Sequence, residues 1–292
     1  MQTFQILSGT DAATGLPVLF VLAFVAVAGA CIGSFLNVVI HRVPREESIV
    51  FPNSRCPACG TNIRPYDNLP VVSWLVLRGR CRACRAPISA RYPAVEALTA
   101  ALFALTFLVR PAVSLSLLFD LVFVAAVVAL VFIDAEHMIL PNAITYPGFL
   151  LALLARALVP NLDGVAFVTD PSGAFPAWAL SLAGALVGAA VGGGSLWLVG
   201  WLWQRARGVE AMGLGDVKMM LMVGAYLGWP LTVLTIFLGV VTGSLAGVSL
   251  MLKRGERDMQ MLLPFGIFLG VGALVSLLFG GAIVGWYLSK FQ

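Results

Sequence analysis

The sequence predicts an all-α polytopic membrane protein with about eight transmembrane helices, because it is too apolar for water and contains several long apolar segments. Hydrophobic residues make up 60% of the 292 residues and charged residues only 11%, and the mean hydropathy is +0.96. A soluble globular domain usually carries about 25% charged residues. Most of the surface must therefore face lipid, which excludes the soluble fold classes.

Eight apolar segments are candidates for crossing the bilayer, which takes about 20 mostly apolar residues in a helix. In chain order they are residues 16–40, 93–109, 112–133, 142–159, 177–203, 213–229, 231–252 and 262–288. The stretch before the first segment has no Lys or Arg, whereas a cleaved signal peptide begins with a basic region. We therefore predict that residues 1–40 form the first transmembrane helix, with the N-terminus in the periplasm.

The loops predict the orientation, because cytoplasmic loops carry an excess of Lys and Arg. Half of the 18 basic residues lie in the connection 41–91, namely Arg42, Arg45, Arg55, Arg64, Arg78, Arg80, Arg82, Arg85 and Arg91. Alternation of the segments places five more on the same side: Arg205, Arg207, Lys253, Arg254 and Arg257. The loops on the opposite side carry mainly Arg110, Lys290, Asp163 and Asp170. We therefore predict that the loop 41–91 is cytoplasmic.

Two cysteine pairs stand in this loop, Cys56 with Cys59 and Cys81 with Cys84. Two such Cys-x-x-Cys knuckles can supply four thiolates at the corners of a tetrahedron around zinc. The reducing cytosol makes disulfides an unfavourable alternative. The spacing therefore predicts a structural zinc ion in a small zinc-ribbon-like cytoplasmic insertion. Two thiol pairs without a metal remain the alternative.

Four acidic residues fall within the predicted spans: Glu96, Asp120, Asp134 and Asp216. Asp134 ends a span that runs towards the cytoplasm, and Asp216 begins a later span that runs away from it, so both lie at one boundary. Two carboxylates at close range share a proton, and one can then activate water while the other donates to a carbonyl oxygen. The pair therefore predicts an aspartic protease, with helix-end residues as the alternative. Glu96 and Asp120 are expected to be buried polar groups between helices.

Six blocks of sequence extend this interpretation. They are 33–42 (GSFLNVVIHR), the two cysteine knuckles, 91–96 (RYPAVE), the segment of Asp134, 212–218 (MGLGDVK) and 264–266 (PFG). With these blocks in this order, the chain resembles the prepilin leader peptidases over nearly its whole length. These are bifunctional peptidase/N-methyltransferases of bacterial type IV pilus and type II secretion systems. The chain departs at Ile267, where many members have proline.

The resemblance implies a GxGD-type intramembrane aspartyl protease whose catalytic pair corresponds to Asp134 and Asp216, within a transmembrane core over residues 92–292. Such enzymes cleave prepilins and pseudopilins after a glycine at the cytoplasmic face of the inner membrane. They then methylate the new N-terminal amine, usually of phenylalanine, with S-adenosylmethionine, an activity associated with the cysteine loop. Their partners are these substrates and the lipid bilayer, and no nucleic acid is expected.

The methyl-donor site is not evident from the residues. No G-x-G-x-x-G fingerprint appears, and the candidates are Gly33, Asn37, Arg42 and Glu96. Two other functions remain open. One is a proton- or metal-coupled transporter that uses Asp134 and Asp216, although the chain lacks the internal repeats common in transporters. The other is a zinc-containing membrane adaptor without chemistry.

Overall fold

The computed structural model describes residues 10–11, 13–160, 162, 173–209, 212–254 and 264–290. Asp163, Asp170 and Arg257, which entered the orientation argument, lie outside the described residues, as do residues 1–9. Among the described residues nearly all regular structure is helical, with three isolated β-bridges and no strand. The chain divides into two compact units, Met1–Ala129 and Leu130–Gln292.

All eight predicted segments are helical in the described part of the chain, which confirms the all-α membrane class. Six are long and apolar enough to cross a membrane: Val18–Arg45, Arg91–Val109, Leu115–His137, Ala177–Arg207, Trp229–Lys253 and Phe265–Leu288. The other two are shorter, α6 (Asn142–Leu158) with 17 residues and α9 (Leu214–Leu227) with 14. At 1.5 Å per residue, α9 reaches only about 21 Å, less than the hydrocarbon core.

The first unit is built on the packing of α2 (Val18–Arg42) against α4 (Arg91–Val109). Gly29 and Gly33 permit the close approach, because added Cβ atoms would lie 2.9 Å from Ala100 Cα and 2.7 Å from Glu96 Cα. Small residues serve this purpose in membrane helices, which cannot rely on hydrophobic association. The connection between α2 and α4 holds two 3₁₀ turns, Val43–Arg45 and Pro65–Asn68, and the short helix α3 (Val72–Val76).

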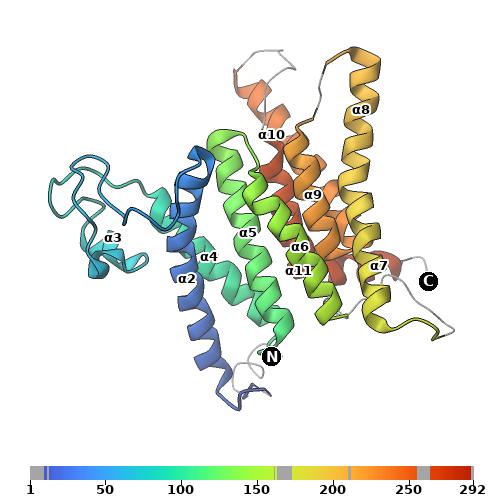
Figure 1. Ribbon diagram of the computed structural model, residues 1–292, viewed down its shortest axis with the longest axis horizontal. Helices are drawn as coiled ribbons and strands as arrows, with labels where there is room; N and C mark the ends of the chain where they lie inside the picture. Colours follow the sequence, from blue (N-terminus) through green and yellow to red (C-terminus); the bar gives the residue numbers. More distant parts are fainter. Residues whose placement is uncertain are drawn as a thin grey trace. The chain divides into compact units, whose positions relative to one another are not determined.

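The second unit is arranged around α9 (Figure 1). This helix packs against α6, α7 (Ala177–Ala189), α10 (Trp229–Arg254) and α11 (Phe265–Leu288). Most side chains from Met219 to the end of this helix are almost inaccessible, and Met219, Met220 and Leu227 are each 0% exposed. A helix covered on all sides by protein does not need the length that contact with lipid requires. That explains how α9 remains short.

The boundaries of these helices follow from backbone chemistry. Prolines directly precede α2, α6, α7 and α11 at Pro17, Pro141, Pro176 and Pro264, and proline disfavours helix in the residue before it. Two glycines with positive φ, Gly208 at +71° and Gly228 at +76°, end α8 (Ser195–Arg207) and α9. Only glycine adopts this conformation without steric cost.

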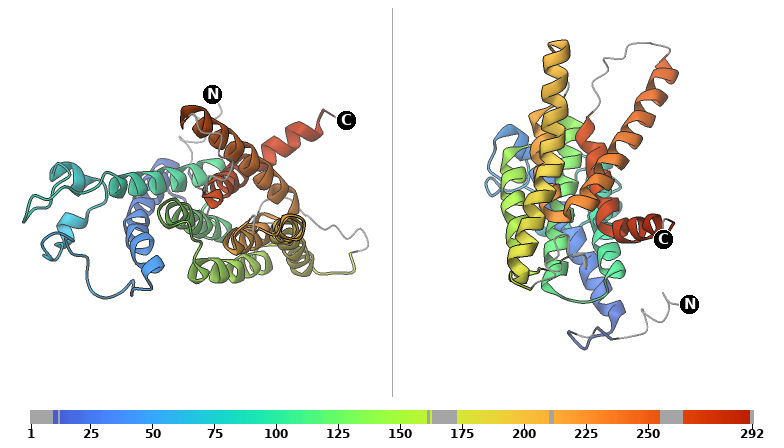
Figure 2. Two further views of the ribbon diagram at one scale, coloured as in Figure 1. Left: turned by 90° about the horizontal axis from the view of Figure 1, so that it is seen from above. Right: turned by 90° about the vertical axis from the view of Figure 1, so that its right-hand side faces the viewer.

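Between α7 and α8 the chain makes a π-helical turn, Ala190–Gly194 (η3), so that the predicted span 177–203 is one continuous helical rod in Figure 2. Gly192 and Gly193 of this turn lie against α9, where added Cβ atoms would collide with Met220 O and Leu221. One turn earlier, Gly188 meets Gly224 of α9 equally closely. The glycine run therefore serves close helix packing.

Candidate active site

Asp134 lies in the last turn of α5 (Leu115–His137) and is 5% exposed. Its Oδ2 accepts a hydrogen bond of 3.1 Å from the backbone N–H of Ile267, and the N–H of Gly266 contributes a second one. Both amides belong to the first turn of α11, where backbone N–H groups have no partner within the helix. Asp134 thus binds the positive end of the α11 dipole, an environment that favours a carboxylate.

Gly266 allows this contact. A Cβ at that position would lie 2.8 Å from Asp134 Oδ2 and 3.1 Å from Cδ1 of Leu140. Any other residue would push the carboxylate away from the amides. Sequence reasoning noted the block Pro264-Phe265-Gly266 but assigned it no role, because a backbone donor leaves no signature in side-chain chemistry. The one signal in the sequence is a proline and a glycine at the start of a helix, Pro264 and Gly266.

Asp216 lies in the first turn of α9. This helix begins directly after Gly213, which has an extended backbone (φ −70°, ψ 138°). Its N–H bonds to the carbonyl of Gly213 at 3.1 Å, and an added Cβ on Gly213 would be 3.6 Å from its Oδ2. Gly215 faces Leu140, with 3.1 Å between an added Cβ and Leu140 Cβ. Gly215 therefore lets the first turn of α9 pack closely against Leu140, and Gly213 leaves room for the Asp216 carboxylate.

Leu140 lies against the starts of both α9 and α11, the helices whose first turns hold Asp216 and the amides bound to Asp134. It packs against Gly215 at the start of α9 and against Gly266 at the start of α11, so the α5–α6 turn contacts both. The charge of Asp134 acts on Asp216 across this junction. The sequence prediction placed both residues at one depth, and the structure brings them within electrostatic reach of each other.

A second link joins α6 and α9 beside the acids. Lys218 Nζ donates to Asn142 Oδ1 at 2.9 Å and lies 5.5 Å from the ring centroid of Tyr146. Both partners belong to the first turns of α6. Since Lys218 is two residues beyond Asp216, its side chain leaves the helix on a different face. It holds the two helix starts together rather than neutralising the acid.

In the first unit, the four cysteines of the knuckles form a cluster. The ligand atoms of Cys56, Cys59, Cys81 and Cys84 all lie within 4.8 Å of one another, and the sulfurs of Cys56 and Cys84 are 3.8 Å apart. A tetrahedral zinc ion with bonds of about 2.3 Å places its sulfurs about 3.8 Å apart. The donor set and the spacing therefore fit a metal ion.

The two knuckles have matching backbones. Cys56 N–H bonds to Thr61 O, and Cys81 N–H bonds to Ala86 O at the equivalent point of the second knuckle. Gly60 and Arg85 take equivalent left-handed positions, with φ of +71° and +63°. This shared form aims each pair of sulfurs inward, as a metal-binding knuckle requires.

The cluster is also electrostatically adapted to a cation. Hydrogen bonding with Thr61 lowers the pKa of Cys59 to about 6, which favours the thiolate, the form that binds metal. Cys84 differs: the N–H of Ala86 lowers its pKa, but hydrogen bonds from Cys59 and the other sulfurs outweigh this and raise it to about 11. Four thiols sharing protons in this way would all ionise only around a cation.

Of the four candidates for the methyl-donor site, Gly33 lies against Glu96. The other side chains form hydrogen bonds within the protein. The Asn37 amide donates to Tyr92 O at 3.1 Å, and the Glu96 carboxylate accepts the Val71 N–H at 2.7 Å. Arg42 donates to the carbonyls of Ser48 and Pro52. Gly33 faces α4 directly. Among the buried side-chain atoms of these four residues in the described part of the chain, Asn37 Oδ1 has no hydrogen-bond partner.

Comparisons with known proteins agree over both units. Residues 27–109 match the family described as Bacterial Peptidase A24 N-terminal domain, and residues 121–248 match the Type IV leader peptidase family. A prepilin leader peptidase/N-methyltransferase of Aeromonas hydrophila is 37% identical, covering 96% of this chain and 98% of its own length. The corresponding protein of Pseudomonas aeruginosa is 35% identical over 93% and 94%. No solved structure matches.

Proposed function

The chain belongs to the family of prepilin leader peptidase/N-methyltransferases, and on that premise we propose that it cleaves the leader peptides of prepilins and pseudopilins with Asp134 and Asp216. The observation that supports this assignment is that the charge of Asp134, near the end of α5, acts on the carboxyl group of Asp216, at the start of α9. The alternative of an ion-coupled transporter finds no support in the comparisons.

The two acids have different partners, and this difference assigns their roles. Asp134 accepts backbone N–H groups at the start of α11, which stabilise negative charge. The proton that the pair shares therefore resides on Asp216. Asp134 is the general base that removes a proton from the attacking water, and Asp216 is the acid that donates its proton to the carbonyl oxygen.

The proton balance of the reaction closes on these two groups. As the water oxygen bonds to the carbonyl carbon, Asp134 gains a proton and Asp216 loses one, giving a neutral tetrahedral intermediate. When the C–N bond breaks, Asp134 passes its proton to the leaving amine and Asp216 regains one from the hydroxyl. The pair returns to its starting state without a metal or a nucleophilic side chain.

We assign a structural zinc ion to Cys56, Cys59, Cys81 and Cys84. Four cysteine ligands leave no open coordination position, so the ion supplies folding energy to the loop 41–91 rather than a reactive water. A loop of this size has little core of its own, and a metal compensates for that.

The second activity, methylation of the new N-terminus with S-adenosylmethionine, rests on the names of the relatives. The candidates Gly33, Asn37, Arg42 and Glu96 stay predictions, and we assign no residue to methyl transfer.

The active site faces the cytoplasm in this proposal. Within the second unit, Arg205 and Arg207 end α8 just before the turn of Asp216, and Lys253 and Arg254 end α10 before α11. Basic residues thus end the helices that precede α9, which carries Asp216, and α11, whose first turn binds Asp134, and this supports a cytoplasmic site in the bacterial inner membrane.

The test is cleavage of a purified prepilin in detergent or liposomes, followed by sequencing of the product N-terminus. We expect one cut before the apolar helix with the wild type and with Glu136→Gln, a carboxylate two residues from the site. Asp134→Asn should give no product above background. Full cleavage by Asp134→Asn would refute the assignment, and a radiolabelled methyl donor would separately test transfer to the product.

A further inference from the structure

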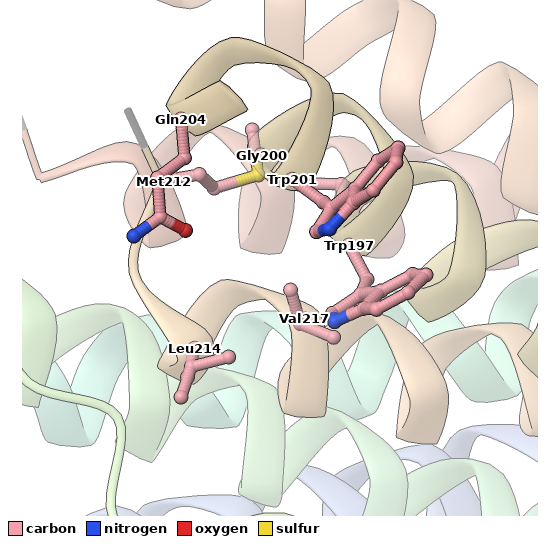
Figure 3. Close-up of a pocket in the computed structure, with 8 residues that line it drawn as sticks. Trp197, Gly200, Trp201, Gln204, Met212, Leu214 and Val217 are labelled. Carbon is pink, nitrogen blue, oxygen red and sulfur yellow. The ribbon is translucent and has the colours of Figure 1, made fainter. Parts of the chain in front are cut away.

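A small groove lies between α8 and the first turn of α9, the turn to which the proposed catalytic acid Asp216 belongs. Figure 3 shows the side chains that line it. Its volume is about 180 Å³. Leu214 and Val217, which flank Asp216 in sequence, form one wall. Because Leu214 and Val217 are three residues apart, they share a face of α9 that differs from the face of Asp216. The groove therefore lies next to the reaction site without containing it.

The opposite wall is aromatic. Trp197 and Trp201, four residues apart on α8, stack with ring centroids 6.4 Å apart and an angle of 17° between the planes. Their indole nitrogens point into the space in Figure 3, and Gln204 stands at its rim. Met212 closes one side with its thioether, a polarizable group that adapts to aromatic partners.

Gly200 creates the space between the rings and the loop. A Cβ added there would be 3.7 Å from Met212 Cβ, so a larger side chain would fill the groove. Tryptophans at a bilayer interface commonly act as lipid anchors, and Trp203, with Arg207 5.4 Å from its ring, fits that description. An anchor needs no glycine beside it. Trp197 and Trp201, by contrast, line a hollow.

We propose that this groove is a substrate subsite that takes one large apolar side chain, preferably aromatic, of the peptide segment lying across Asp216. The proposal rests on the proposed peptidase function. A cavity of roughly 150 Å³ accepts a benzene ring, so this groove suits one side chain rather than a whole small molecule. An extended peptide advances about 3.3 Å per residue, which places the side chain within a few residues of the scissile bond.

The chemistry of the walls supports a peptide as the occupant. The tryptophan faces and Met212 suit an apolar ring, while the indole N–H groups and the Gln204 amide suit the carbonyls of an extended backbone. A lipid acyl chain could use the apolar walls but would leave these donors unmatched. Selectivity for the residue beside the cut would then come from α8.

The kinetic test compares Gly200→Leu with Gly194→Leu, a matched change on the same helical segment where an added Cβ meets nothing within 4 Å. We expect Gly200→Leu to lower kcat/KM for the normal prepilin about tenfold or more, mainly through KM. A substrate with alanine at the accommodated position should be cut nearly as well by this variant as by the wild type, which also shows that the variant is folded. Equal losses on both substrates, or a loss with Gly194→Leu alone, would overturn the proposal.

A cross-linking test is independent of turnover. Synthetic prepilin segments carry a photoreactive benzoylphenylalanine at successive positions around the cut and are irradiated with full-length Asp134→Asn protein. Adducts on Met212 or residues 196–204 from one position are expected. Adducts confined to other helices would contradict the subsite, and so would labelling of Trp197 by a photoreactive fatty acid that the peptide does not displace. If the wild type cuts nothing but the adducts form, the peptidase function fails while the groove remains a peptide site.

Discussion

At the scale of single residues, the decisive difference between the two acids is the backbone that surrounds them. Asp134 accepts N–H groups from Gly266 and Ile267, whereas the influences on Asp216 are its burial and the charge of Asp134. Chemically identical side chains therefore take different roles, as paired carboxylates do when their surroundings differ. The asymmetry originates in α11, which contributes no acid at all.

Ile267 offers a direct test of this contact. Proline is tolerated in the first turn of a helix and is common at this position in the family that the sequence resembles, so Ile267→Pro should fold while removing one donor to Asp134. One hydrogen bond contributes about 0.5–1.5 kcal/mol, so we expect kcat for prepilin cleavage to fall about two- to tenfold. Ile267→Ala keeps the N–H and should change kcat little. Equal kcat values for the two variants would show that this amide does not position Asp134.

At the scale of helices, the site depends on how closely α9 is held by its neighbours. Gly188 and Gly224 let the backbones of α7 and α9 touch. Near the same end of α9, Arg156 of α6, which is 1% exposed, donates from Nε to Tyr226 O at 3.0 Å. It thereby satisfies a carbonyl at the C-terminus of α9, where a cation is favourable. Packing thus fixes a helix too short to be positioned by the bilayer.

Gly224→Ala tests the close crossing. Its Cβ would collide with the carbonyl oxygen of Gly188, which cannot move as a flexible side chain could. Overpacking of this kind costs about 1–3 kcal/mol, so thermal unfolding in detergent should occur at lower temperature than for the wild type. Gly281→Ala on α11 is the control, because its Cβ meets nothing within 4 Å. A similar melting temperature for all three proteins would argue against a tight α7–α9 contact.

At the scale of the whole molecule, the sequence was sufficient for the helices, while the common depth of the acids stays a prediction. Lipid imposes a strong, local compositional signal, so each apolar segment could be located, and alternation of sides placed Asp134 and Asp216 at one boundary. The Cys-x-x-Cys pairs likewise predicted a cluster whose sulfurs do converge.

Other features depend on contacts that composition does not encode. The role of Gly266 and Ile267 follows from a backbone amide meeting an acid far away in the chain. The groove depends on the hollow at Gly200, which is visible only once α8 packs beside α9. The shortness of α9 follows from its burial rather than from its hydropathy. The domain boundaries at residues 40 and 91 and the methyl-donor residues stay predictions.

The metal assignment is tested on the intact protein. Metal analysis should find about one zinc ion per chain, and Cys59→Ser with Cys84→Ser should reduce it to a small fraction. Proteolysis of the loop 41–91 should then become faster, because the loop loses the ion that folds it. Cys31→Ser, an exposed cysteine of α2 outside the cluster, should retain the zinc. Unchanged metal content in the double variant would exclude these ligands.

The central claim is that Asp134 and Asp216 act as one acid–base pair, and a double-mutant cycle of prepilin cleavage measures this most directly. General acid–base groups contribute about 10²- to 10⁴-fold, and residues that act as a unit are not additive. We therefore expect Asp134→Asn and Asp216→Asn each to lower kcat by that amount, and the double variant to be no worse than either. Near-normal kcat in one single variant, or losses that multiply in the double variant, would contradict the claim.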